Sequence, residues 1–276
     1  VGSEMCIRDR FDTATDEDFE NIESVVAHEY FHNYTGNRVT CRDWFQLSLK
    51  EGLTVFRDQE FTSDLNSRPV KRIQDVRFLR DYQFPEDAGP TAHPVRPESF
   101  LEINNFYTVT VYEKGSELIR MLQTLIGREA FTQGVQHYLK KYDGQAATVE
   151  NFLEAIAESS RTDLEPFRAW YRQAGTPKVS VRGQYSENKQ EYELHFEQSY
   201  PKLSAAGERQ AVPIPIQIGL LNKAGESIAS AETDVFLLEK PKDRLVLTEI
   251  SEQPIPSLRR QFSAPVRLEY DYSPEE

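Results

Sequence analysis

The fold is decided by residues 28–32, His-Glu-Tyr-Phe-His, which Glu51 follows after a gap of eighteen residues. Two histidines four positions apart on a helix of 3.6 residues per turn point about 40° from each other, so both imidazoles project to the same side. Imidazole is a good zinc ligand, and a carboxylate from a second element completes a three-ligand set that leaves a fourth position for water. Glu29, beside the first ligand, can accept a proton from that water as it attacks a carbonyl. The pattern predicts a zinc hydrolase and favours a peptidase.

The flanking residues predict that both parts of this pattern lie on helices. Thr15 can cap a helix together with Asp18, and Thr35-Gly36 offers a stop. A second helix is expected to start near Phe45 and to carry Glu51. Apolar stripes support both helices: Ile22, Val25, Val26 and Phe31 in the first, and Leu47, Leu49, Leu53, Val55 and Phe56 in the second. The competing interpretation is a pair of solvated helices whose histidines are incidental.

Three stretches share a likeness to one known family. Residues 26–40 (VAHEYFHNYTGNRVT) contain the histidine pair, residues 44–54 (WFQLSLKEGLT) contain the glutamate, and residues 104–115 (NNFYTVTVYEKG) lie further on. They resemble the active-site helix, the third-ligand helix and the catalytic-tyrosine stretch of the gluzincin metallo-aminopeptidases, and most closely the bacterial alanyl members. The resemblance runs from about Asp12 to the C-terminus and is densest before residue 120.

The resemblance implies a role for each of five residues. His28, His32 and Glu51 would bind one zinc ion, and Glu29 would be the general base. Tyr112 would stabilise the tetrahedral intermediate, which suits a phenol whose ordinary pKa of about 10 keeps it protonated at neutral pH. Without the resemblance, Tyr112 would be taken for a helix-packing aromatic.

Asp58 lies two helical turns beyond Glu51 and therefore on nearly the same helix face. Metal-bound histidines usually donate their second ring N–H to a carboxylate or carbonyl, so Asp58 is a candidate partner for one of them. The alternative is a solvated acid near Arg57. The remaining histidines lack ligand spacing and are interpreted as loop, helix-surface and strand residues: His93, His137 and His195.

The sequence departs from the family pattern at its start. The family carries a Gly-x-Met-Glu-Asn loop upstream of the zinc helix, whose glutamate binds the free α-amine of the substrate, and no such segment occurs here. Residues 1–11 do not resemble the family and are interpreted as an artefactual leader. We therefore expect a fragment of a longer enzyme, inactive alone. We also expect the apolar stripe of its zinc helix to be exposed, with poor solubility as the result.

Composition excludes several classes of protein. The net charge of −13 argues against nucleic-acid binding. No apolar run approaches the eighteen residues of a membrane span, and no signal peptide is visible. Cys6 and Cys41 are the two cysteines, which leaves no disulfide framework and favours a reducing compartment. The sequence predicts a cytoplasmic protein whose partners are peptide substrates.

The hydrophobic period predicts two domains, a mainly helical one over residues 12–175 and a small β-sandwich over 176–276. The resemblance implies that the first is part of a thermolysin-like catalytic domain, so the expected fold class is an α+β multidomain chain. Before Pro177 the period is helical, and the predicted helices are a segment opening at Ser67 and ending before Pro85, one through Tyr112 to Gly127, and 128–142, 148–159 and 164–174. After Pro177 it alternates, in strands near 179–185, 192–196, 212–218, 233–238, 244–247 and 266–270. Pro213 and Pro215 suggest an edge strand or a bulge, and residues 222–225 suggest a hairpin turn.

The function expected from these observations is a zinc-dependent aminopeptidase that removes N-terminal residues from peptides. Three alternatives remain: a zinc endopeptidase on the same scaffold, an epoxide hydrolase of the leukotriene-hydrolase branch, and a non-catalytic interaction protein built on a dead zinc scaffold. The presence of Glu29 and Tyr112 weighs against the last.

Overall fold

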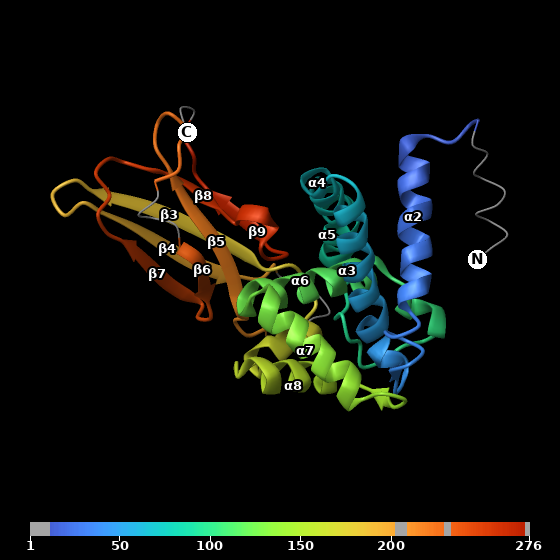
Figure 1. Cartoon of the computed structure of the whole chain (residues 1–276). Coiled ribbons are helices and arrows are strands. Elements are labelled where there is room, and N and C mark those ends of the chain that lie inside the picture. The colour runs from blue at the N-terminus through green and yellow to red at the C-terminus, as the bar shows by residue number, and fades with distance from the viewer. Residues whose placement is uncertain (1–11, 202–208, 229–232, 274–276) are drawn as a thin grey trace.

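A helical part and a β-sandwich follow each other along the chain in the computed structural model (Figure 1). The structure describes residues 12–201, 209–228 and 233–273. The predicted leader, residues 1–11, lies outside the described residues. The predicted order of a mainly helical part before a small sandwich is confirmed.

The helical part is built from helices joined by turns and by longer loops. Their bounds are α2 Asp16–Phe31, α3 Leu47–Leu65, α4 Arg68–Phe78, α5 Phe84–Ala88, α6 Gly115–Ile126, α7 Arg128–Lys141, α8 Val149–Ser160 and α9 Ala169–Arg172. Two π-helical turns, Leu79–Gln83 and Thr110–Lys114, precede α5 and α6. Two short parallel strands, β1 Thr40–Cys41 and β2 Ala146–Ala147, tie the loop after α2 to the loop before α8. The helix α3, which carries Glu51, lies among α2, α4 and α6.

Two predicted helix ends are wrong. The helix that opens at Ser67 does not stop before Pro85, because a π-turn leads into α5 and Pro85 falls in the first turn of that helix, where its missing N–H costs no hydrogen bond. The helix predicted over residues 164–174 is shorter, a 3₁₀ turn Pro166–Arg168 followed by α9. Two apolar residues of α4, Val70 and Ile73, are both 53% exposed.

The sandwich consists of a four-stranded and a three-stranded sheet over the described residues. The strands are β3 Lys178–Ser186, β4 Glu191–Ser199, β5 Ile214–Leu221, β6 Thr233–Leu238, β7 Lys242–Leu247, β8 Ile255–Leu258 and β9 Arg267–Tyr270. The sheet orders are β7-β4-β3-β9 and β6-β5-β8. All neighbours are antiparallel except β3 and β9. Alternating apolar residues of the two sheets face each other, and Phe196 of β4 stacks on Phe236 of β6 at 4.7 Å between ring centroids.

Pro215 lies in β5, and Pro213 lies just before that strand. β5 is the middle strand of its sheet, so the predicted edge strand is wrong, whereas the register shift between Ile216 and Ile218 confirms the predicted bulge. Pairing with β8 begins only at Ile218, so Pro215 lies where β5 has β6 as its single neighbour. A missing N–H at that point removes no ladder bond to β8.

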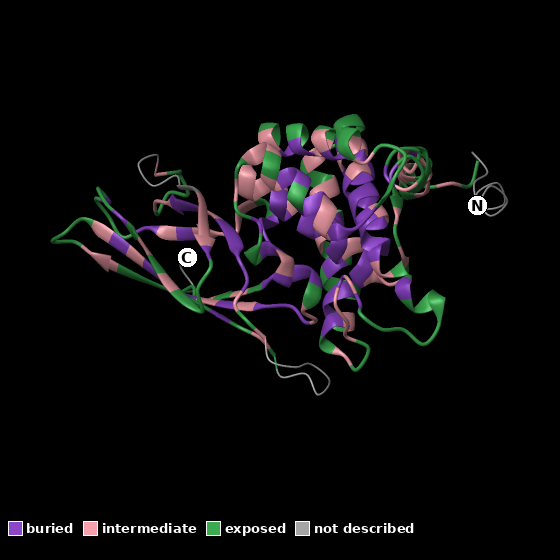
Figure 2. Ribbon diagram, turned by 90° about the horizontal axis from the view of Figure 1, so that it is seen from below, coloured by how far each residue is buried: buried purple, intermediate pink, exposed green. Residues whose placement is uncertain are grey.

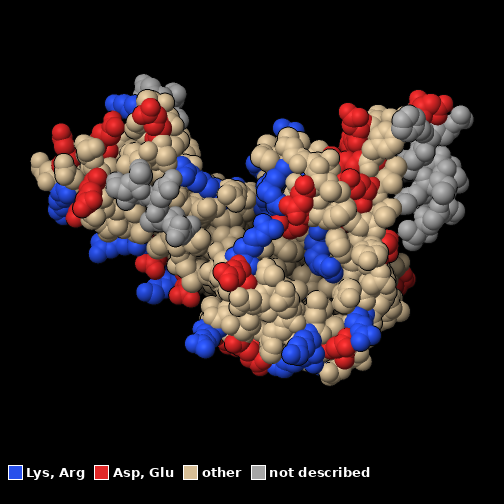
Figure 3. Space-filling view, viewed as in Figure 1, with Lys and Arg blue, Asp and Glu red and all other residues tan. Residues whose placement is uncertain are grey.

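The helical part and the sandwich share one hydrophobic core. Trp170 of α9, 2% exposed, donates its ring N–H to the carbonyl of Pro213 at 2.7 Å. Phe262, after β8, packs against Leu79 and Phe84 of the helical part. A cavity of about 630 Å³ lies beside this contact, and Figure 3 shows Lys and Arg side chains along the hollow between the two parts.

Helix α2 is the least covered of the long helices. Ala27 is its one buried residue, while Val25 and Val26 are 40% and 52% exposed. Figure 1 shows α2 flanking the other helices at one side of the molecule, and Figure 2 shows mostly exposed and intermediate residues on that helix. The expectation that its apolar stripe is exposed is confirmed for these valines. Within the described ranges, no helix combines the length and apolarity that a bilayer crossing needs.

Candidate metal centre

The helix that carries the two histidines begins as the sequence predicts. Thr15 accepts a hydrogen bond from the backbone N–H of Asp18 at 3.3 Å, and the Asp18 carboxylate accepts one from the backbone N–H of Thr15 at 2.8 Å. This capping box satisfies two otherwise free donors. The helix ends at Phe31 with His32 as its C-cap, earlier than the predicted stop at Thr35-Gly36. Because His32 keeps helical dihedral angles, both imidazoles still face α3.

The three predicted ligands converge on one point. The Nε2 atoms of His28 and His32 lie 3.2 and 3.1 Å from the same carboxylate oxygen of Glu51. The two imidazole rings stand edge to face, with 4.6 Å between their centroids. One potential ligand atom from each residue lies within 4.8 Å of the others, and no second group of this kind occurs in the part of the chain that the structure describes.

The other ring nitrogen of each histidine is held by an acceptor. Nδ1 of His28 lies 2.7 Å from Oδ2 of Asp58, so the contact predicted for Asp58 is present. Nδ1 of His32 lies 2.8 Å from the carbonyl oxygen of Thr35. A carbonyl can only accept, so Nδ1 of His32 donates to it, and Nε2 is the ring nitrogen that the neutral imidazole can offer to a metal ion. Two such oriented imidazoles and one carboxylate are a donor set that fits zinc.

The charges around the site favour a cation. Burial raises the pKa of Glu51, but hydrogen bonds with His28, His32 and Lys50 outweigh it and hold that pKa well below its usual range. Burial lowers the pKa of His28, yet the hydrogen bonds with Asp58 and Glu51 raise it to about 9. His28 therefore donates from both ring nitrogens, to Asp58 and to Glu51, and it must lose the Nε2 proton to bind a metal ion. A divalent cation that displaces this proton would meet an ionised Glu51.

Tyr112 lies beside this group, on the π-turn Thr110–Lys114 that precedes α6. Burial raises its pKa above the usual value, and the nearby charge of Glu51 raises it further, with a smaller effect from Glu29. The hydroxyl is therefore protonated at neutral pH and can act only as a neutral hydrogen-bond donor or acceptor. The sequence pattern predicted an ordinary helix here and did not predict the π-turn.

Close backbone contact fixes α3 against this turn. The Ser48 hydroxyl donates to the carbonyl oxygen of Val111 at 2.8 Å, and both groups are buried. A side chain on Gly52 would lie 2.9 Å from the backbone carbon of Gly115. Glycine at both positions is what allows the helix of Glu51 and the turn of Tyr112 to approach so closely.

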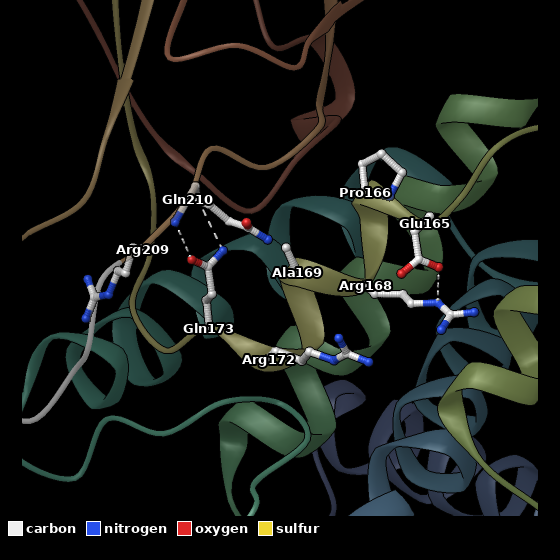
Figure 4. A pocket seen from close by; sticks show the side chains of 8 residues that line it. All are labelled: Glu165, Pro166, Arg168, Ala169, Arg172, Gln173, Arg209 and Gln210. Carbon is white, nitrogen blue, oxygen red and sulfur yellow. Dashed lines mark hydrogen bonds and ion pairs between the residues drawn. The ribbon is translucent and has the colours of Figure 1, made fainter.

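Glu29 is exposed, at the rim of a cavity of about 630 Å³. The wall of this cavity includes His32, Trp44 and Lys50. Lys50 also pairs with Glu51 through its ammonium group. A second cavity of about 590 Å³ contains none of the predicted site residues. Figure 4 shows that Arg168 there turns to Glu165, and that Gln173 pairs with Gln210.

Sequence reasoning missed a polar network behind His32. The hydroxyls of Thr35 and Thr54 lie 2.7 Å apart, and both residues are buried. The guanidinium of Arg57 lies 4.2 Å from the ring centroid of Phe31 and donates to its carbonyl oxygen at 3.2 Å. Thr54 and Arg57 follow Glu51 at helical spacing on α3, which places them near the helix face that carries Glu51. The sequence does not predict which residues they contact. The network stiffens the end of α2.

The remaining histidines are placed as predicted, and none belongs to the group of possible metal ligands. His93 lies in a loop, His137 lies on the exposed side of α7, and His195 lies on β4. His137 pairs with Glu158 at 3.0 Å, which is a surface contact.

Residues 2–171 match the peptidase family M1 domain. The chain belongs to peptidase family M1. The predicted likeness to metallo-aminopeptidases is thereby confirmed, and residues 175–271 match a domain of unknown function with an Ig-like fold. The chain is 50% identical to aminopeptidase N of Escherichia coli over 97% of its own length, and 51% identical to aminopeptidase N of Haemophilus influenzae over 96%.

A solved structure extends the likeness to three dimensions. Aminopeptidase A of Legionella pneumophila, in complex with aspartic acid, superposes with a TM-score of 0.82 at 34% identity over 95% of this chain and 28% of that one. The M1 chain described here spans 31% of the length of the E. coli and H. influenzae proteins. The M1 match includes the histidine pair, Glu51 and Tyr112.

Proposed function

We propose that this chain carries the catalytic centre of a zinc-dependent aminopeptidase that acts on peptides. The observation that carries the proposal is the convergence of both Nε2 atoms, of His28 and His32, on Glu51, with their Nδ1 atoms held by Asp58 and a backbone carbonyl. The membership in peptidase family M1 and the aminopeptidase relatives support it.

Each residue has a role that its position supports. His28, His32 and Glu51 would hold the zinc ion, and Asp58 would orient His28. When bound, zinc supplies a Lewis acid that polarises the scissile carbonyl and makes water more acidic. Glu29 accepts a proton from the attacking water and delivers it to the leaving amine. Tyr112 donates a hydrogen bond to the oxyanion of the tetrahedral intermediate.

The same proposal includes the domain limits and the location. Residues 12–175 would form part of the catalytic domain and residues 176–276 the sandwich, a division that the change from helices to strands supports. A cytoplasmic location agrees with the free thiol of Cys41.

The test uses the full-length protein that contains this chain. Glu29→Ala should retain one equivalent of zinc and lose turnover, whereas His32→Phe should lose zinc. Glu129→Ala, an exposed glutamate on α7, is the matched control and should change neither. Unchanged turnover in Glu29→Ala would refute the general base, and full zinc occupancy in His32→Phe would refute that ligand.

Substrate comparison separates the aminopeptidase from its alternatives. The wild type should cleave a peptide with a free N-terminus and leave the N-acetylated peptide intact. Equal cleavage of both would favour a zinc endopeptidase. Zinc binding without cleavage of either would favour a non-catalytic scaffold.

A further inference from the structure

A fully buried ion pair lies behind the Tyr112 turn. Nζ of Lys114 is 2.7 Å from Oδ2 of Asp87, and the two side chains are 1% and 0% exposed. Withdrawing both charges from water costs free energy that their attraction does not always return, so such a pair is weak evidence for stability alone. A role in fixing geometry is therefore worth testing for Asp87 and Lys114.

The pair reaches across to the start of the sandwich. Asp87 accepts hydrogen bonds from the backbone N–H of Gly175 at 2.6 Å and from the hydroxyl of Thr176 at 3.0 Å. Lys114 donates to the carbonyl oxygen of Gly175 at 3.2 Å. Gly175 has a φ of +92°, which glycine adopts without strain, and the strand β3 begins at Lys178. The buried charges thus bind the first residues of the second matched domain.

Lys114 is also the last residue of the π-turn that carries Tyr112. The first residue of that turn, Thr110, donates its backbone N–H and its hydroxyl to the Glu86 carboxylate, at 2.9 and 2.5 Å. Gln83 donates to the Thr110 hydroxyl at 3.2 Å. The segment 83–87 therefore holds both ends of the turn, and Tyr112 lies between them.

We propose that the Asp87–Lys114 pair is a positioning pair, which fixes the π-turn Thr110–Lys114 and with it the hydroxyl of Tyr112. Gly175 and Thr176, the first residues of the second matched domain, complete its hydrogen bonds, so the sandwich contributes to the alignment of the site. This role is assigned to the start of a domain of unknown function, and it rests on the proposed function of Tyr112. The pair acts through Tyr112 and does not touch substrate.

The test is a double-mutant cycle in the full-length, zinc-loaded enzyme. Lys114→Met should lower kcat by about 10²-fold, with KM and zinc content unchanged, because a misplaced catalytic group loses transition-state contacts. In a Tyr112→Phe background, the same substitution should lower kcat less than about twofold further, because residues that act as a unit are not additive. Lys141→Met removes an exposed ion pair with Glu158 and is the matched control, which should leave kcat unchanged.

Thr176→Val tests the contribution of the sandwich with a substitution of nearly equal shape. It removes one hydrogen bond to Asp87 and should lower kcat in the wild type but not in the Tyr112→Phe background. Hydrogen exchange provides a readout without turnover, since the amides of Thr110–Lys114 should exchange faster in Thr176→Val. This variant keeps the inference testable if Lys114→Met does not fold.

The outcomes separate this inference from the proposed function. Equal losses of kcat in both backgrounds, or unchanged exchange of the turn in Thr176→Val, would overturn the positioning role. In that case an inactive Glu29→Ala would leave the proposed function standing. If instead Glu29→Ala and Tyr112→Phe both retained full turnover, the proposed function itself would fail.

Discussion

His28 and Asp58 lie on adjacent helices, with Nδ1 of the histidine 2.7 Å from Oδ2 of the carboxylate. The contact orients the imidazole so that Nε2 faces Glu51 at 3.2 Å. Asp58 is buried, and its other carboxylate oxygen accepts a hydrogen bond from the Ser24 hydroxyl at 3.4 Å.

Asp58→Asn should weaken zinc binding by about 10–100-fold, because an amide is a poorer acceptor for the ring N–H than a carboxylate. Competition with a chromogenic chelator measures the affinity. The control is Asp64→Asn, because the Asp64 side chain lies on the same helix and is 62% exposed. This variant should bind zinc as the wild type does. Equal affinities in all three proteins would contradict the orienting role.

Tyr112→Phe should lower kcat by about 10²–10³-fold and retain zinc, because it removes one donor to the oxyanion and nothing from the ligand set. Steady-state kinetics and metal analysis check it together. Tyr142→Phe, at the end of α7, should have full activity. A large rise in KM with unchanged kcat would point to substrate binding in place of the oxyanion.

Glu113 should make stability depend on pH. Burial, together with the charges of Asp75, Asp58 and Glu117, raises its pKa from 4.5 to about 8. At a pH between 4.5 and about 8, Glu113 keeps its proton in the folded state and has lost it in the unfolded chain. The contribution of Glu113 to stability is therefore full below pH 4.5 and is lost as the pH rises to about 8.

Glu113→Gln should remove this loss, so the free energy of unfolding should fall less steeply with pH than in the wild type. The difference is at most about 1.4 kcal/mol per pH unit for one proton. Denaturant titrations from pH 5 to about 8 measure it, with the exposed Glu129→Gln as control. Parallel curves for wild type and Glu113→Gln would mean that Glu113 titrates alike in both states.

Gly52→Ala should destabilise the protein. The new Cβ would lie 2.9 Å from the backbone carbon of Gly115, which cannot rotate away. Overpacking of this kind costs about 1–3 kcal/mol and outweighs the gain of about 0.5–1 kcal/mol from replacing glycine in a helix. Thermal melting should show a lower midpoint, while Gly89→Ala, with its nearest neighbour at 3.4 Å, should melt normally.

Local patterns carried much of the prediction. The Thr15 capping box, the second helix with Glu51 and the alternating strands after Pro177 all rest on residues a few positions apart, and each is present. The prediction that one helix ends before Pro85 is wrong because a π-turn continues the helical backbone there. Residue spacing does not predict such a turn. The prediction of an edge position for β5 is wrong because β5 also pairs with β8, and that pairing depends on residues near 255.

The sequence by itself determined the chemistry: two imidazoles at helical spacing, a carboxylate on a second helix, and a tyrosine in a matching stretch. The imidazoles and the carboxylate follow from residue type and short-range periodicity, which the backbone enforces locally, whereas the tyrosine was predicted from the family resemblance. Only the tertiary structure decided that both Nε2 atoms meet one oxygen of Glu51, and that the buried Asp87–Lys114 pair ties the Tyr112 turn to Gly175. Those contacts join residues up to 88 positions apart, and their geometry follows from packing that no local pattern specifies.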